Sequence, residues 1–145
     1  VFSFWQELGF VEGLNGLKIV RERYLQRMKR GETIYYFGPS ASAYVNMEAY
    51  WDDFNERREQ KGIGAWTLFC DNARKPWGER RAKLKHTLCR YMPKNVVTHA
   101  WVEIFPDAIA VGINYQKLMS VIINNKYVAE TFKHFFDLLW QQGRE

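Results

Sequence analysis

Residues 98–114, THAWVEIFPDAIAVGIN, hold the side chains of this chain that are best suited to chemistry. His99 stands on a first run of β-forming residues, Asp107 in a short turn, and Gly112 and Asn114 on the returning run. Two such runs joined by a tight Pro-Asp turn predict a β-hairpin. A histidine on a strand becomes a nucleophile only when neighbouring groups orient and activate it, so its partners decide its role.

The hairpin resembles the motif of the phospholipase D superfamily, in which His-x-Lys is followed by an Asp and then by Gly and Asn on the return strand. In that family the His is the nucleophile for phosphodiester chemistry, the Lys binds the phosphate and the Asp orients a His. This chain departs from the pattern, because Trp101 stands in place of the Lys and Asp107 falls one place late, after Pro106. An indole lacks the charge that stabilises a transferring phosphoryl group. We therefore expect no catalytic residue here, and we interpret His99 as a histidine hydrogen-bonded in a sheet or pocket.

The closing stretch, SVIINNKYVAETFKHFFDLLW, carries a second resemblance, to the carboxyl end of TrmB-type transcriptional regulators. Members of that family end with Ile-x-Ile-x-Asn and then Ala-x-x-Phe-x-x-x-Phe-x-x-Leu-Trp. The matching residues here are Ile122, Asn124, Ala129, Phe132, Phe136, Leu139 and Trp140. Residues 10–40 are also similar to the start of the family's effector domain, and CRYMPK resembles the Arg-Tyr-Leu-Pro that precedes its hairpin.

The TrmB resemblance covers the chain from about residue 10 to residue 141. It implies a phospholipase D-like fold with a decayed catalytic motif, in a domain that binds a small-molecule effector, often a sugar, and forms a homodimer. Such a domain controls a winged helix-turn-helix, which we expect upstream of Val1 and outside this sequence. We therefore expect residues 1–145 to form a single ligand-sensing domain that acts on DNA indirectly.

The effector contacts cannot be copied from the family motifs, so we predict them from the residues themselves. Candidates are the stacking and hydrogen-bonding groups near converging strand ends, which sugar pockets usually combine: Tyr36, Ser40, His99, Trp101 and Glu103. Strand alternation predicts that His99, Trp101 and Glu103 share one face, which Tyr36 reaches from a neighbouring strand. The alternative is that Tyr36 and Trp101 are ordinary core aromatic residues.

Two further function classes remain open. A phosphodiesterase or nuclease that uses His99 in a dimeric site would follow from the hairpin alone. A free-standing nucleic-acid-binding module would follow from the basic stretch RRAKLKHTLCR, because clustered cations release counterions from phosphates. We favour a solvated helix surface for this stretch, with Leu84 and Leu88 turned inward.

Composition narrows the possibilities further. The net charge of +5 permits contact with anions without requiring it. His86 and Cys89 stand three apart without a second ligand pair, so we expect no metal, and no motif indicates a cofactor. The two cysteines form no close pair, which favours a reducing, cytoplasmic setting. No apolar run approaches the roughly 18 to 20 residues that cross a bilayer, so we expect no membrane partner.

The elements that must position these residues follow from hydrophobic periodicity. We predict strands at 4–8, 32–38, 63–70, 96–105, 108–115 and 118–123. Predicted helices cover 13–31, 43–62, a basic segment within 72–88, and the tail to residue 142. Alternating strands and helices followed by a three-stranded meander predict an α/β fold, with a mixed β-sheet and helices on both faces.

The terminal helix has a broad apolar stripe. Its members are Val128, Ala129, Phe132, Phe135, Phe136, Leu139 and Trp140. Because the helix follows a strand directly, we expect it to fold back onto the sheet and close the domain. A dimer contact through its exposed edge remains open. Phe136→Asp distinguishes the two roles, because it should unfold a closed domain and only dissociate a dimer.

Overall fold

The computed structural model describes residues 7–145, which form an α/β fold around one seven-stranded sheet. The strands are β1 (Leu8–Glu12), β2 (Thr33–Phe37), β3 (Gly64–Phe69), β4 (Thr87–Tyr91), β5 (Ala100–Phe105), β6 (Ala108–Tyr115) and β7 (Lys117–Ile123). The main helices are α1 (Gly13–Arg27), α2 (Glu48–Lys61), α3 (Glu79–Ala82) and α4 (Lys126–Gln142), with a 3-10 turn η1 (Ala41–Tyr44). Within the described residues, no helix combines the length and apolar character needed to span a bilayer.

The sheet has the strand order β1-β7-β6-β5-β2-β3-β4 and is mixed, as predicted. Strands β2, β3 and β4 run parallel to one another, and the other neighbouring pairs are antiparallel. The predicted hairpin is present, since Phe105 pairs with Ala108 across the Pro106–Asp107 turn. The parallel strands are joined through helices, as parallel crossovers require.

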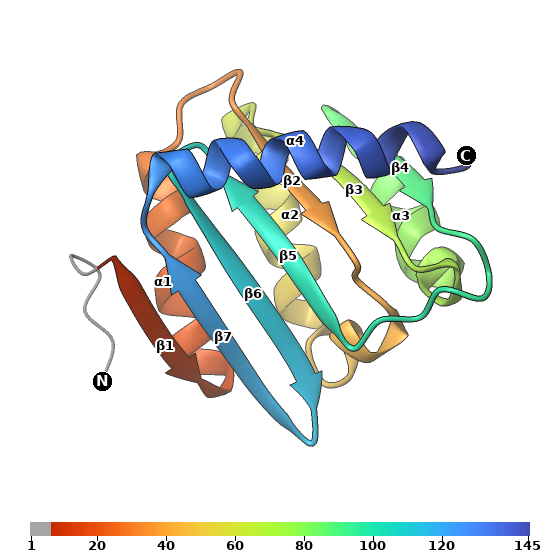
Figure 1. The fold of residues 1–145 in the computed structure, drawn as a ribbon, viewed down its shortest axis with the longest axis horizontal. Helices are drawn as coiled ribbons and strands as arrows, with labels where there is room; N and C mark the ends of the chain where they lie inside the picture. Colours follow the sequence, from red (N-terminus) through yellow and green to blue (C-terminus); the bar gives the residue numbers. More distant parts are fainter. Residues whose placement is uncertain (1–6) are drawn as a thin grey trace.

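Helices cover both faces of the sheet, which confirms the predicted architecture. Figure 1 shows α4 lying across the front of the sheet and α1 and α2 behind it. Alternation along the strands sends Tyr36, Trp101 and Phe105 into the larger core under α1 and α2. The same alternation sends Leu68 and Ile104 into a smaller core under α4.

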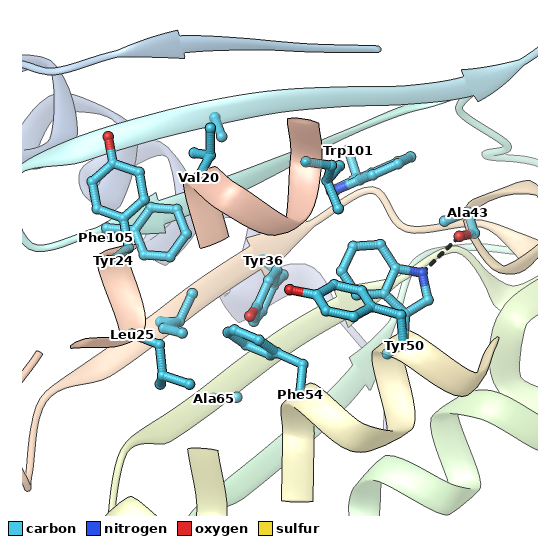
Figure 2. Close-up of a cluster of buried hydrophobic side chains, with 14 of the residues drawn as sticks. Val20, Tyr24, Leu25, Tyr36, Ala43, Tyr50, Phe54, Ala65, Trp101 and Phe105 are labelled. Carbon is cyan, nitrogen blue, oxygen red and sulfur yellow. Dashed lines mark hydrogen bonds between the residues drawn. The ribbon is translucent and has the colours of Figure 1, made fainter. Parts of the chain in front are cut away.

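The larger core is built mainly from aromatic rings. Figure 2 shows Tyr24 of α1 beside Phe105 of β5, and the two rings stack with centroids 4.3 Å apart. The bond drawn to the Ala43 carbonyl oxygen comes from Nε1 of Trp51, at 2.8 Å. This hydrogen bond fastens η1 to α2, so the turn that follows β2 is held against the core.

The predicted basic helix is wrong over most of its length. Helix α3 ends at Ala82, and residues 87–91 form β4, a parallel strand at the edge of the sheet. Its backbone pairs in register with β3, from Ala65 opposite Thr87 to Phe69 opposite Tyr91. This pairing outweighs the helical preference of the Lys- and Leu-rich sequence, since propensity is a weak prior against tertiary context. Leu88, expected to turn inward from a helix, is therefore exposed on β4.

Other boundaries also differ from prediction, among them the start of α2, which was predicted at residue 43 and lies at Glu48. The first strand was predicted at residues 4–8, of which 4–6 lie outside the described residues, and the observed strand is Leu8–Glu12. Helix α1 ends at Arg27 rather than near Gly31, because Met28 already has an extended backbone. The predicted stop at Gly62 is confirmed, since its left-handed conformation (φ 78°) caps α2.

Helix α4 closes the smaller core. Asn125 caps its amino end by accepting hydrogen bonds from Tyr127 N and Val128 N. Ala129 and Phe136 are buried against the sheet, as predicted. Phe135 and Leu139 were placed in the same stripe but are exposed, because the inward face of the helix is narrower than the apolar pattern.

Candidate functional site

The carboxyl ends of β2 and β3 and the amino end of β5 lie at the same end of the sheet. There Gly38 takes a left-handed backbone (φ 91°). A Cβ at this position would lie 2.9 Å from the Ala100 carbonyl oxygen, so the chain passes too closely for a side chain. Thr98 Oγ1 donates a hydrogen bond to Gly38 O at 2.8 Å. These contacts bring the loop after β2 beside the predicted histidine.

Ser40 lies buried in this loop. Its hydroxyl is 2.8 Å from that of Ser42, and the Asn114 amide donates to the carbonyl oxygens of Ser42 and Val45 at 3.0 and 2.9 Å. Asn114, the last residue of the hairpin motif, therefore holds the segment after β2 against β6. The Gly-to-Asn part of the motif has a structural role here that needs no substrate.

His99 lies in a bend just before β5 and is exposed. Its ring packs against Tyr115 with centroids 5.1 Å apart, and no ion pair of the described residues includes it. The prediction that it shares a strand face with Trp101 and Glu103 is wrong, because the strand begins only at Ala100. Asp107 lies in the turn at the opposite end of β5, where it pairs with Arg27 at 2.6 Å.

The remaining predicted site residues lie together in the larger core. Glu103 forms an ion pair with Arg21 of α1, and it accepts a hydrogen bond from Trp101 Nε1 at 3.1 Å. Arg21 also donates to the Tyr36 hydroxyl at 3.2 Å. Its guanidinium lies 4.4 Å from the centre of the Trp51 ring. The structure thus brings Tyr36, Trp101 and Glu103 together around Arg21, in contacts that do not include Ser40 or His99.

A narrow cavity of about 40 Å³ lies beside this cluster. The side chains that line it include Arg21, Tyr36, Tyr44, Asn55, Thr67, Arg81 and Trp101. Two of these, Tyr36 and Trp101, were predicted as ligand contacts. A larger groove of about 520 Å³ runs along the edge strand β4 and is lined by residues that include Trp66, Arg90 and Trp140.

Sequence reasoning missed the buried arginines, although the pattern contained a signal for them. Arg21 stands four residues after Leu17 and three before Tyr24, both of which are on the buried face of α1. Arg58 likewise follows Phe54 by four on the buried face of α2. An arginine on the apolar face of a helix predicts a buried charge that needs partners.

Burial dominates the electrostatics of this core. It raises the pKa of the Tyr44 hydroxyl well above its ordinary value and lowers the pKa of Arg58. Burial also raises the pKa of the Cys89 thiol to about 11. The described residues contain no group of three or more His, Cys, Asp or Glu side chains placed to hold a metal ion.

No protein-family model matches the sequence, and no curated protein matches it. Solved structures do match it. TrmBL2, an archaeal chromatin protein with a novel mode of DNA binding, matches over 99% of this chain with a TM-score of 0.66 and 16% identity. The chain spans 56% of the TrmBL2 chain.

Two further structures match at similar levels. Nuc from Salmonella typhimurium, a phospholipase D family member, has a TM-score of 0.65 and 14% identity, with 94% of this chain and 95% of that chain covered. NucT from Helicobacter pylori has a TM-score of 0.68 and 8% identity, with 94% and 97% covered. At such identities these matches establish the fold alone. The chain has the phospholipase D-like fold, which is also that of the matched part of TrmBL2.

Proposed function

We propose that this chain is a non-catalytic, effector-binding and dimerising domain of a TrmB-like transcriptional regulator. The proposal rests on one observation, that the hairpin lacks the catalytic arrangement of the phospholipase D motif. Trp101, which stands in place of the phosphate-binding Lys, is buried and hydrogen-bonded to Glu103. His99 lies outside the strand, with the Tyr115 ring packed against it. A nucleophilic histidine without an orienting partner or a nearby cation lacks the means of phosphoryl transfer.

Size is our argument for where an effector would bind. Pockets for small-molecule ligands usually measure about 300–1,000 Å³, so the core cavity of about 40 Å³ is too small for a sugar. The groove of about 520 Å³ along β4 has the required size and offers the Trp140 ring with Arg90 above it, 4.7 Å from the ring centre. We propose this groove for a sugar-sized effector. The second location that we consider is the loop after β2, which holds Ser40, together with the neighbouring His99.

The outer face of α4 is the surface we propose for a second copy of the chain. Phe135 and Leu138 are 49% and 62% exposed on this helix, and Tyr127 and Leu139 extend the apolar stripe. A helix that is apolar on both sides is normally covered on both. Most soluble oligomers are symmetric homodimers, and pairing of two α4 helices about a two-fold axis would cover this stripe.

Contact with DNA is proposed to be indirect. TrmBL2 binds DNA, and the present chain matches 56% of it. In the basic segment Arg80 and Arg81 both pair with Asp52, and Arg90 donates to the Trp140 carbonyl oxygen. Most of the cations that suggested a nucleic-acid-binding helix therefore have partners within the fold. This favours DNA binding by another part of the protein.

A thermal-shift screen against sugars and other metabolites, followed by calorimetry, tests effector binding. We expect a stabilising ligand whose affinity falls in Arg90→Gln and is retained in His99→Ala. If the affinity instead falls in His99→Ala and is retained in Arg90→Gln, the site lies beside Ser40 and His99. If a broad library gives no stabilising ligand, only the dimerising role survives.

Hydrolysis of a generic phosphodiester tests the competing function. The parent chain should give no turnover above buffer, with an active phospholipase D-type nuclease as the positive control. Turnover that is lost in His99→Ala would replace our proposal by a phosphodiesterase.

A further inference from the structure

Two buried arginines from different parts of the chain line the core cavity. Arg21 comes from α1 and is 2% exposed, and Arg81 comes from α3 and is 6% exposed. Both line the cavity of about 40 Å³, together with the side chains of Tyr36, Tyr44, Asn55 and Thr67. Guanidinium groups are seldom buried unless their charge and their N–H donors have partners.

The protein supplies acceptors for only part of these two guanidinium groups. Arg21 Nη1 pairs with Glu103 and Nη2 donates to Tyr36, but Nε has no acceptor among residues 7–145. Arg81 Nη1 donates to Asp52 Oδ1 at 2.7 Å, but the buried Nη2 has no acceptor among the same residues. A buried donor left without an acceptor is destabilising, and more so when it is charged.

The charges around the cavity are also unbalanced. A third guanidinium, that of Arg58, is fully buried and donates only to neutral oxygens, those of Asn55, Ile63 and Thr87. The carboxylates in contact with this group of arginines are Glu103 and Asp52, and Asp52 is shared with Arg80. Among the described residues, two carboxylates pair with Arg21, Arg80 and Arg81, while Arg58, buried outside the cavity lining, has only neutral acceptors. Glu22, an acidic residue near Arg21, is already paired with Arg57.

We propose that the cavity is a binding site for one small monovalent anion, with Arg81 Nη2 and Arg21 Nε as its charged donors. The ion supplies the missing negative charge and accepts the unpaired N–H groups. The volume of about 40 Å³ suits a halide or a one-carbon oxyanion such as formate, since a single water needs about 10–15 Å³ of such space. A phosphodiester or a sugar is excluded by size. This site is independent of the groove and of the proposed regulatory function.

The anion would join two segments that otherwise have few polar links. Arg21 is anchored in α1 over the sheet, whereas Arg81 belongs to the short helix that leads into the edge strand β4. An ion held between them would fix α3 against the core. Its loss should loosen residues 74–86 before the rest of the domain.

Thermal unfolding at constant ionic strength tests the site with defined probes. Sodium gluconate, whose anion is too large for the cavity, is replaced stepwise by sodium chloride or sodium formate. We expect Tm to rise saturably, by several degrees between about 1 and about 100 mM of the small anion, as ligand linkage requires. Hydrogen exchange in residues 74–86 should slow in parallel.

A matched pair of variants separates the site from general screening. Arg81→Met removes the cavity donor and should abolish the dependence on the small anion. Arg80→Met removes a neighbouring cation that pairs with the same Asp52 but does not line the cavity, and it should keep the dependence. If both variants lose it equally, or if gluconate stabilises the parent as well as formate does, the proposal is overturned.

Crystals of the parent chain grown in sodium bromide give a test that needs no folded variant. An anomalous peak within hydrogen-bond range of Arg81 Nη2 and Arg21 Nε is expected. Density explained by water alone, together with a Tm that does not change with chloride or formate, would refute the site.

Discussion

Arg21 of α1 and Glu103 of β5 form an ion pair in the core, and the two residues are 2% and 1% exposed. The Glu103 carboxylate also accepts from Trp101 Nε1, and the Arg21 guanidinium lies 4.1 Å from the centre of the Phe54 ring. The pair therefore links the first helix to the central hairpin. Two predicted ligand contacts, Trp101 and Glu103, belong to this link, which explains why their polar groups face one another.

Removing one partner of this pair should be strongly destabilising. Glu103→Gln leaves the buried Arg21 charge without its counterion, and we expect a loss of about 3–5 kcal/mol in the free energy of unfolding. The double variant Arg21→Met with Glu103→Gln removes the charges together and should recover most of that loss. Urea unfolding of the parent, the two single variants and the double variant measures the coupling. Additive effects would show that the pair contributes no interaction of its own.

The two core helices and the hairpin were predictable because their residues follow strong local rules. Leu17 and Tyr24 lie on one face of α1, and the Pro106–Asp107 turn separates two runs of β-forming residues. Strand β4 was not predictable in this way. Residues 87–91 combine Thr and Tyr, which favour strands, with Leu, Cys and Arg, which do not, and β3 offers them a free edge to pair with.

The candidate site was predictable only where local sequence rules apply. Alternation placed Trp101 and Glu103 on one face, which is correct, because both residues lie within β5. It failed for His99, since the first residue of a strand cannot be read from periodicity to better than a few residues. The buried arginines carried a positional signal, but their shared cavity depends on how α1, α2 and α3 pack together.

Adjacent phenylalanines on α4 should respond differently to the same substitution. Phe136 is 0% exposed and packs between Tyr35 and Trp140, with ring centroids at 5.1 and 5.4 Å. Phe136→Asp buries an unpaired charge and should unfold the domain, which circular dichroism would detect. Phe135→Asp changes the exposed face and should leave the fold intact while dissociating the proposed dimer.

Light scattering of Phe135→Asp measures the second outcome. Ile19→Asp, at a residue that is also exposed but on α1, serves as the control and should not change the mass. A parent chain that is monomeric at high concentration would remove the dimer proposal and leave the folding role of Phe136 intact.

Cys89 predicts a pH dependence in the alkaline range. Burial raises the pKa of its thiol from 9.0 to about 11, so the folded state favours the neutral thiol. The resulting stabilisation is fully present below pH 9 and is lost as the pH rises towards about 11. At pH 8 the folded protein should hold about a hundredth of the thiolate of an unfolded chain, and alkylation should slow accordingly. Peptide mapping after iodoacetamide treatment measures this, with the urea-unfolded chain as reference.

Restoring the lysine of the phospholipase D motif should not restore catalysis. Trp101 is buried, and its indole fills the space beside Gly112, where an added Cβ would collide with it. Trp101→Lys would place an ammonium group beside Arg21 while leaving a cavity, and we expect a loss of at least about 3 kcal/mol in stability. His99 would remain outside the strand, so phosphodiester hydrolysis should stay at the background rate.

Trp101→Phe, which keeps an apolar ring, should lose less stability and serves as the control. Hydrolysis gained in Trp101→Lys and abolished by adding His99→Ala would show that the site is one substitution away from activity.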